Sequence, residues 1–201
     1  MDLSDVYARK KRGCQILFTR QSDCLQPFRM QLCRCDRRTV VLWALTMARQ
    51  TAGELAEKYP QHSDVQTAVE VCFAWASGKV KMPQAKSYIL QMHAMAKTVS
   101  DPADAARFHA VGQACSAVHT ETHAMGFAVY DGTALVCAVP QPAAERLLAP
   151  RLQQYADCLQ RCVQAAAEPG RAWAPFLCRA QENKEYLLWL KEQPAVPQGT
   201  S

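Results

Sequence analysis

Residues 36–60 read DRRTVVLWALTMARQTAGELAEKYP, and this stretch decides the fold class. Asp36 is a favourable helix N-cap, because its carboxylate can accept a hydrogen bond from a backbone N–H of the first turn. Apolar residues then recur at intervals of three and four, which is the spacing of one helix face. Tyr59 precedes Pro60 and therefore disfavours the helical conformation. The pattern predicts a helix over Arg37–Lys58.

The three segments that follow repeat this amphipathic pattern. A capping-box sequence begins at Ser63, and Gly78 supplies a stop for the helix that it opens. Pro83 opens a third predicted helix, and Asp101 caps a fourth, which reaches Val118 and then either bends or continues to residue 130. The predicted apolar faces contain Val65, Ala68, Val69, Cys72 and Ala76, then Ala85, Ile89, Met92, Ala96 and Val99, then Ala105, Phe108, Gly112 and Cys115.

The C-terminal third is interrupted by proline and glycine. Asp131-Gly132 predicts a turn, and residues 133–139 are ambiguous, although the helical context favours a helix. A helix over residues 142–167 is expected to kink near Pro150. After Gly170, a last predicted helix carries Trp173, Phe176, Leu177, Ala180, Leu187, Leu188 and Leu190.

These elements predict an all-α fold, an antiparallel helical bundle of about six to seven helices with short loops. Residues 1–35 form a basic, partly irregular leader, and residues 36–139 form the central helical bundle. Residues 140–193 add C-terminal helices to the same core, and the proline-rich tail 194–201 is expected to fray.

The composition fits a globular protein, with 49% hydrophobic and 20% charged residues. The longest apolar runs, VVLWAL and ALVCAV, are far shorter than the ~20 residues that span a bilayer. No export signal is visible, so we expect a cytoplasmic protein without a membrane partner. Most of the ten cysteines are interpreted as reduced thiols, with Cys72, Cys115, Cys158 and Cys162 on apolar helix faces.

The positive charge is confined to the N-terminus. Residues 1–38 contain nine Lys or Arg against four Asp, whereas the remaining chain is balanced. Basic residues interleaved with Tyr7, Phe18 and Phe28 are one signature of nucleic-acid binding. The alternative is a solvated leader whose arginines pair with acids on the bundle. A nucleic-acid-binding or generic interaction module is therefore an alternative function, although the excess of charge is modest.

His119 and His123 form the sharpest constellation that chemistry might use. Histidines four residues apart in an unbroken helix lie on one face, as a shared metal ion requires. A third ligand would come from His93, His109, Glu121 or Cys115, none of them at a diagnostic spacing. The alternative, which we favour, is that both histidines are packed or hydrogen-bonded at a helix junction. A metal-dependent helical-bundle enzyme is the third hypothesis.

Other catalytic patterns are missing from the sequence. No GxxxxGK[ST], GxGxxG or GxSxG motif occurs, so phosphate-loop, dinucleotide and serine-hydrolase functions have no support. We therefore predict no catalytic residue and no cofactor.

Five stretches together resemble one family, the immunity proteins of bacterial polymorphic toxin systems. They are residues 36–50, 68–86, 90–97, 101–119 and 122–130. The most specific points are Trp43-Ala44, AWASG at residues 74–78 and AVHTETHA at residues 117–124. In the family pattern a histidine commonly follows the glycine, where this chain has Gly112-Gln113. If the family histidines form a metal or polar site, Gln113 weakens it here.

The resemblance implies a protein that binds and blocks a cognate toxin and needs no catalytic residues of its own. It leaves the partner-binding residues unknown. Inhibitors of basic nuclease toxins are expected to present acid, whereas this chain is basic overall. Either the toxin is of another class, or an acidic patch is hidden by the average, with Glu54, Glu57, Asp64 and Glu70 as candidates.

Overall fold

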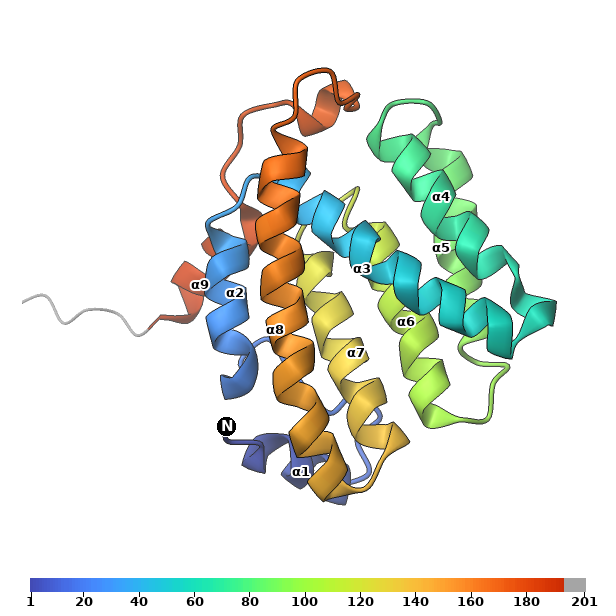
Figure 1. Ribbon diagram of the computed structural model, residues 1–201, viewed down its shortest axis with the longest axis vertical. Coiled ribbons are helices and arrows are strands. Elements are labelled where there is room, and N and C mark those ends of the chain that lie inside the picture. Colours follow the sequence, from blue (N-terminus) through green and yellow to red (C-terminus); the bar gives the residue numbers. More distant parts are fainter. Residues whose placement is uncertain (194–201) are drawn as a thin grey trace, which may run out of the picture.

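The computed structural model describes residues 1–193, and these residues form an all-helical protein, as predicted (Figure 1). The predicted number of six to seven helices is too low, because the described residues contain nine α-helices and three short 3₁₀ turns. The α-helices are α1 (Ser4–Lys11), α2 (Gln26–Cys33), α3 (Arg37–Lys58), α4 (Asp64–Ala76), α5 (Met82–Met95), α6 (Pro102–Ser116), α7 (His123–Ala138), α8 (Gln141–Ala166) and α9 (Lys184–Glu192). The 3₁₀ turns are η1 (Asp23–Leu25), η2 (Pro60–His62) and η3 (Pro175–Leu177).

Helix α3 is the centre of the fold and packs against α4, α6, α7 and α8. Its predicted bounds and its cap are confirmed, since Asp36 Oδ1 accepts a hydrogen bond of 2.8 Å from the Thr39 N–H. The Trp43 ring is fully buried and lies 4.7 Å from Phe28 and 5.8 Å from Phe127, centroid to centroid. Its indole N–H donates to the backbone carbonyl of Tyr155 at 3.0 Å. One aromatic cluster therefore joins α2, α3, α7 and α8.

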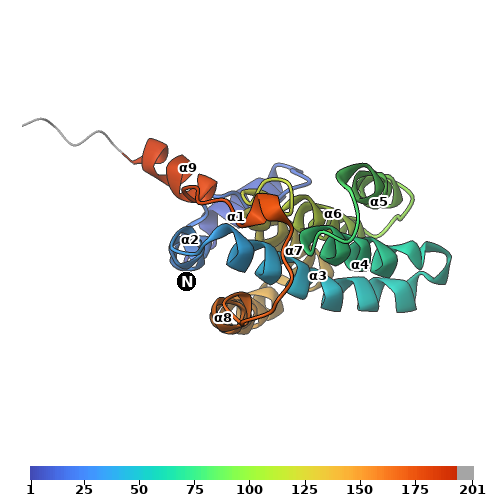
Figure 2. The same cartoon turned by 90° about the horizontal axis from the view of Figure 1, so that it is seen from above.

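Helices α4 to α7 follow one another along the chain and pack in the same order, α4 on α5, α5 on α6 and α6 on α7. The short connections between them place consecutive helices side by side. Gly78 ends α4 as predicted, with a φ of +79° that L-residues rarely adopt. Figures 1 and 2 show α4 and α5 at one side of the bundle and α8 with α2 at the other.

The N-terminal segment contributes to this core. Leu17 and Phe18 are buried, and the Leu17 N–H donates to the Thr133 hydroxyl at 3.0 Å. A Cβ atom on Gly132 would lie only 3.2 Å from the Phe18 ring. The turn predicted at Asp131-Gly132 is therefore wrong. Both residues lie inside α7, and the glycine is needed for the close approach of Phe18 rather than for a turn.

Two other local predictions also fail. The last predicted helix is two elements, since η3 and α9 are separated by a non-helical stretch at residues 178–183. Ser63 has a helical backbone conformation and makes no side-chain capping bond, so the capping box is not formed. The long helix near Pro150 is confirmed as α8, with that proline inside it.

The buried side chains on both sides of residues 35 and 139 belong to one hydrophobic cluster, and the proposed division at these positions stays a prediction. The ten cysteines are free thiols, with Cys72, Cys115, Cys158 and Cys162 buried as predicted. None of the described helices combines the length and the hydrophobicity that crossing a membrane requires. The predicted frayed tail, residues 194–201, lies outside the described residues.

Candidate partner-binding cleft

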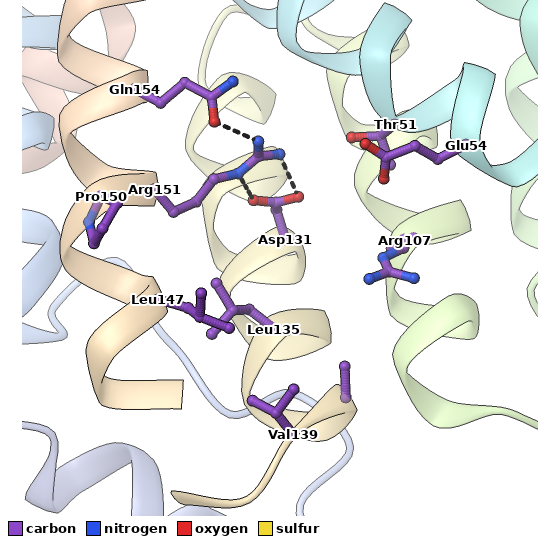
Figure 3. A pocket seen from close by; sticks show the side chains of 11 residues that line it. Thr51, Glu54, Arg107, Asp131, Leu135, Val139, Leu147, Pro150, Arg151 and Gln154 are labelled. Carbon is purple, nitrogen blue, oxygen red and sulfur yellow. Dashed lines mark hydrogen bonds and ion pairs between the residues drawn. The ribbon is translucent and has the colours of Figure 1, made fainter. Parts of the chain in front are cut away.

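A cleft of about 380 Å³ opens between α3, α6, α7 and α8 (Figure 3). One end is apolar, with side chains from α7 and α8 and from the residue that follows α7. The other end is polar and charged, with side chains from all four helices. The apolar residues are Leu135, Ala138, Val139, Leu147 and Pro150, and the polar residues are Thr51, Glu54, Arg107, Asp131, Arg151 and Gln154.

The floor of the cleft is an ion pair between α7 and α8. Arg151 donates from Nε and from Nη2 to the two oxygens of Asp131, at 2.7 and 2.9 Å. The hydroxyl of the fully buried Tyr155 donates to Asp131 Oδ2 as well. Such a bidentate pair is directional, because both N–H groups must align with the carboxylate. It therefore fixes α7 against α8 below the opening.

These contacts decide the protonation states at the floor. Burial raises the pKa of Tyr155 well above its ordinary value, and the neighbouring Asp131 charge raises it further. Burial alone would lower the pKa of Arg151, but the hydrogen bonds and charge of Asp131 raise it overall. Tyr155 thus stays a neutral hydrogen-bond donor, and the arginine stays a cation.

A chain of amides carries the polar network across to α3. Arg151 Nη1 donates to Gln154 Oε1 at 2.7 Å, and Gln154 Nε2 donates to Gln50 Oε1 at 3.0 Å. Gln50 in turn donates to Glu54 Oε1 at 3.2 Å. Glu54, one of the four predicted acidic candidates, therefore ends this chain on the rim of the cleft.

A second buried carboxylate, Asp104, orients another charged side chain of the cleft, Arg107. Asp104 is fully buried and accepts hydrogen bonds from Lys58, from Tyr59 Oη at 2.7 Å and from Arg107 Nη1 at 2.8 Å. Burial would raise the pKa of Asp104, but these three donors together lower it below its ordinary value. Asp104 thus orients Arg107, whose guanidinium lines the cleft on the same side as Glu54, across from Asp131 and Arg151 (Figure 3).

The charges that line the cleft are balanced, with two carboxylates facing two guanidiniums. The buried carboxylates and Tyr155 are engaged by internal hydrogen bonds, so they are poorly placed to accept a proton from a substrate. The arrangement suits non-covalent binding of a side chain that has an apolar stem and a polar end. It does not resemble a nucleophile with an adjacent base.

The structure separates the two histidines that the sequence offered as metal ligands. Helix α6 ends at Ser116, so the pattern bends, and His119 lies exposed in a turn with its ring stacked 6.5 Å from Trp75. His123 opens α7, where its Nδ1 lies 2.7 Å from Gln113 Oε1. Gln113, the residue that departs from the family pattern, is therefore the hydrogen-bond partner of His123.

The four residues offered as third ligands have other partners. His93 and His109 lie together, with their Nδ1 atoms 2.9 Å apart, and burial lowers the pKa of both rings. Glu121 is buried, 3.4 Å from Arg37, and accepts from the Lys184 N–H. The hydrogen bond with the neighbouring Cys72 thiol, together with burial, raises the pKa of Cys115. Within residues 1–193, no group of three His, Cys, Asp or Glu side chains is arranged to hold a metal ion.

The other acidic candidates are exposed, and one is neutralised. Glu70 makes a bidentate pair with Arg49, at 2.8 and 2.9 Å. Glu57 and Asp64 are solvent-exposed on α3 and at the start of α4.

The polar floor of the cleft was not predicted from the sequence. Its available signal was Arg151 and Tyr155, which lie four residues apart and hence on one face of α8.

The described residues thus form an all-helical protein with a cleft that is apolar at one end and charged at the other. The family model of the Imm-5 like putative immunity protein matches residues 31–161, and the chain belongs to this family. The predicted resemblance is confirmed. The match includes every residue that lines the cleft, whereas α1 and α9 lie outside it. The comparisons with curated proteins and with solved structures gave no match.

Proposed function

We propose that this protein binds a cognate bacterial toxin in the cytoplasm and neutralises it by steric or electrostatic blockade, without catalysis. The observation that carries the proposal is the family match over residues 31–161, which includes the whole of α3 to α7 and most of α8. The cleft supports the same function, because its charged groups are held by one another rather than arranged around a reacting atom. An interface of standard size would occupy about 800 Å² of this surface.

The contacts of the basic N-terminus weigh against the nucleic-acid alternative. Several of its cations donate hydrogen bonds to protein groups. Lys10 Nζ donates to the Val136 carbonyl at 2.8 Å, and Arg20 donates to the Thr122 carbonyl at 3.0 Å. Arg29 is buried and paired with Glu185 at 2.8 Å. Cations held in this way release few counterions from a phosphate backbone.

Co-expression tests the proposal. The chain is produced together with the toxin domain encoded next to its gene, and cell survival is measured with and without the chain. We expect protection, and we expect a catalytically inactivated form of the toxin domain to co-purify with the chain. Neither protection nor a complex, with any toxin encoded nearby, would contradict the proposal.

A further inference from the structure

Helix α9 does not pack its apolar side chains into the hydrophobic core, as a surface helix normally does. Its sequence, KEYLLWLKE, contains five consecutive apolar residues at 186–190, yet its one buried residue is Glu185. None of those five side chains belongs to the hydrophobic core of the described residues. A surface helix normally turns its apolar stripe to the core, so this orientation needs a cause.

This orientation is caused by charged contacts between α9 and α2. The Arg29 guanidinium, itself 1% exposed, contacts Glu185 at 2.8 Å and Glu192 at 2.6 Å. The two glutamates are seven residues apart and therefore lie on one face of α9. Burial raises the pKa of Glu185, and the charges of Arg20 and Arg29 act against this rise. This face of the helix points to the protein because the Arg29 charge cannot be left without a partner.

The N-terminus of α9 is fixed by a second set of bonds. The Asn183 side chain accepts from the backbone N–H of Glu185 at 2.8 Å, as an N-cap does. Its Nδ2 donates to the carbonyls of Leu32 and Cys35, both at 2.9 Å. A free helix of nine residues is unstable in water, so these polar contacts are what hold α9 in one position.

These contacts leave an apolar and aromatic face of α9 turned outward. Tyr186 and Leu190 are 37% and 44% exposed, and the Tyr186 and Trp189 rings stack at 6.0 Å. Figure 2 shows α9 projecting from the edge of the bundle. Tyrosine and tryptophan are the side chains most enriched at binding hot spots. An aromatic face that is already held rigid loses little conformational entropy when a partner covers it.

Cations outnumber unpaired acids among the exposed residues of α9 and of the segment that precedes it. Arg179, Lys184 and Lys191 are exposed, against one exposed acid without an ion-pair partner in the described residues, Glu182. Glu185 and Glu192 are balanced by two cations, Arg29 and Arg20, of which Arg20 lies 3.7 Å from Glu185. A complementary partner therefore offers an apolar groove bordered by carboxylates.

We infer that the outward face of α9, formed by Tyr186, Trp189 and Leu190, is a docking surface for the toxin. This inference rests on the proposed function and names the surface that performs it. The face lies outside the family match, which ends at residue 161. It therefore offers a place where this chain can select its own partner without changing the helices of the family core.

The test compares two exposed leucines in the full-length chain. Leu190 and Leu90 are 44% and 58% exposed and lie on α9 and on α5. Each is replaced by glutamate, and affinity is measured against the catalytically inactivated toxin domain encoded beside the gene. Leu190→Glu is expected to weaken binding by about tenfold or more, because it removes an anchor and adds charge facing carboxylates. Leu90→Glu is expected to leave it within about twofold.

A charge variant checks the predicted border. Lys191→Glu is expected to slow association and to reduce its dependence on salt, because steering by complementary charge acts mainly on the association rate. Circular dichroism of each variant shows whether the fold is retained.

The outcomes separate the inference from the proposed function. If the wild-type chain binds the toxin and Leu190→Glu binds equally well, the docking surface on α9 is wrong and the proposed function stands. If the wild-type chain binds none of the nearby toxins, both fail. Self-association of the isolated chain that Leu190→Glu abolishes, or binding of the chain to anionic vesicles through Leu190, would assign the face to a second copy or to a membrane and would overturn the inference.

Discussion

Two buried charge clusters bind helices to one another in this protein, and they differ in completeness. At the floor of the cleft, Asp131 accepts hydrogen bonds from Nε and Nη2 of Arg151 and from the Tyr155 hydroxyl. At α9, Arg29 Nη2 and Glu185 Oε2 are buried without a hydrogen-bond partner among residues 1–193. A fully satisfied network strengthens packing, whereas a partly satisfied one costs stability that something else must justify.

The difference teaches where stability and specificity reside. The complete cluster joins α7 to α8 inside the family match, where both helices also contribute to the hydrophobic core. The incomplete cluster holds a helix outside the match and outside that core, with its apolar face turned to solvent. We call the first cluster, Asp131 with Arg151 and Tyr155, the brace, because it stabilises the fold. We call the second cluster, Arg29 with Glu185 and Glu192, the mount, because it positions a binding surface.

The largest effect is expected at the brace. Asp131→Ala leaves Nε and Nη2 of Arg151 and the Tyr155 hydroxyl without their acceptor, and the Arg151 charge without its carboxylate partner, in a partly dry site. We expect the free energy of unfolding to fall by about 3 kcal/mol or more, measured by urea denaturation. A loss below about 1 kcal/mol, the size of a surface effect, would show that this network is not a brace.

The next effect is expected at the mount. Glu185→Ala removes one of the two partners of Arg29, and we expect a loss of about 2 kcal/mol in the contact of α9 with α2. Because α9 lies outside the core, amide exchange should accelerate at residues 184–192 and stay unchanged in α3 and α7. Equal acceleration in all three helices would show that α9 is part of the core unit, contrary to the comparison.

Two buried carboxylates should respond to pH with opposite sign. The folded pKa of Asp104 is lowered, so its ionised form stabilises the protein above pH ~4, and this is lost as pH falls through the folded value. The folded pKa of Glu185 is raised, so its contribution is full below its unfolded value and is lost as pH rises through the folded value.

Paired amide variants measure these contributions. Asp104→Asn should flatten the acid-side fall in unfolding free energy, and Glu185→Gln should flatten the loss on the way up from pH ~4.5. If both substitutions change the slope of the unfolding free energy against pH in the same direction, the assignment of the two carboxylates is contradicted. Urea titrations at a series of pH values give both curves.

The smallest effect is expected at the surface. Arg49 and Glu70 form a bidentate pair, but both side chains are more than half exposed. Glu70→Ala should change the unfolding free energy by less than about 1 kcal/mol. The same denaturation assay applies, and a loss as large as that of Asp131→Ala would remove the distinction between buried and exposed pairs.

The parts of the fold that local signals specify were predictable from the sequence. The bounds of α3 follow from the Asp36 cap, the apolar periodicity and Pro60, all of which act within a few residues. The buried face of α4 follows from periodicity in the same way. Local rules succeed where the deciding contacts are local.

Predictions failed where distant residues decide. Asp131-Gly132 has the composition of a turn, yet the carboxylate is satisfied by side chains 20 and 24 positions along the chain. Gly132 is required by Phe18, more than a hundred residues before it. A similar limit applies to α9, because its apolar residues predict a core helix and the ion pair with Arg29 turns them outward. No spacing rule connects residue 29 to residue 185.

The toxin-docking surface that we infer is the outward face of α9. Hydrogen exchange of the full-length chain, with and without the catalytically inactivated toxin domain, tests this inference most directly. We predict slower exchange at residues 184–192 on complex formation. Unchanged exchange at residues 184–192 in the complex would contradict the inference.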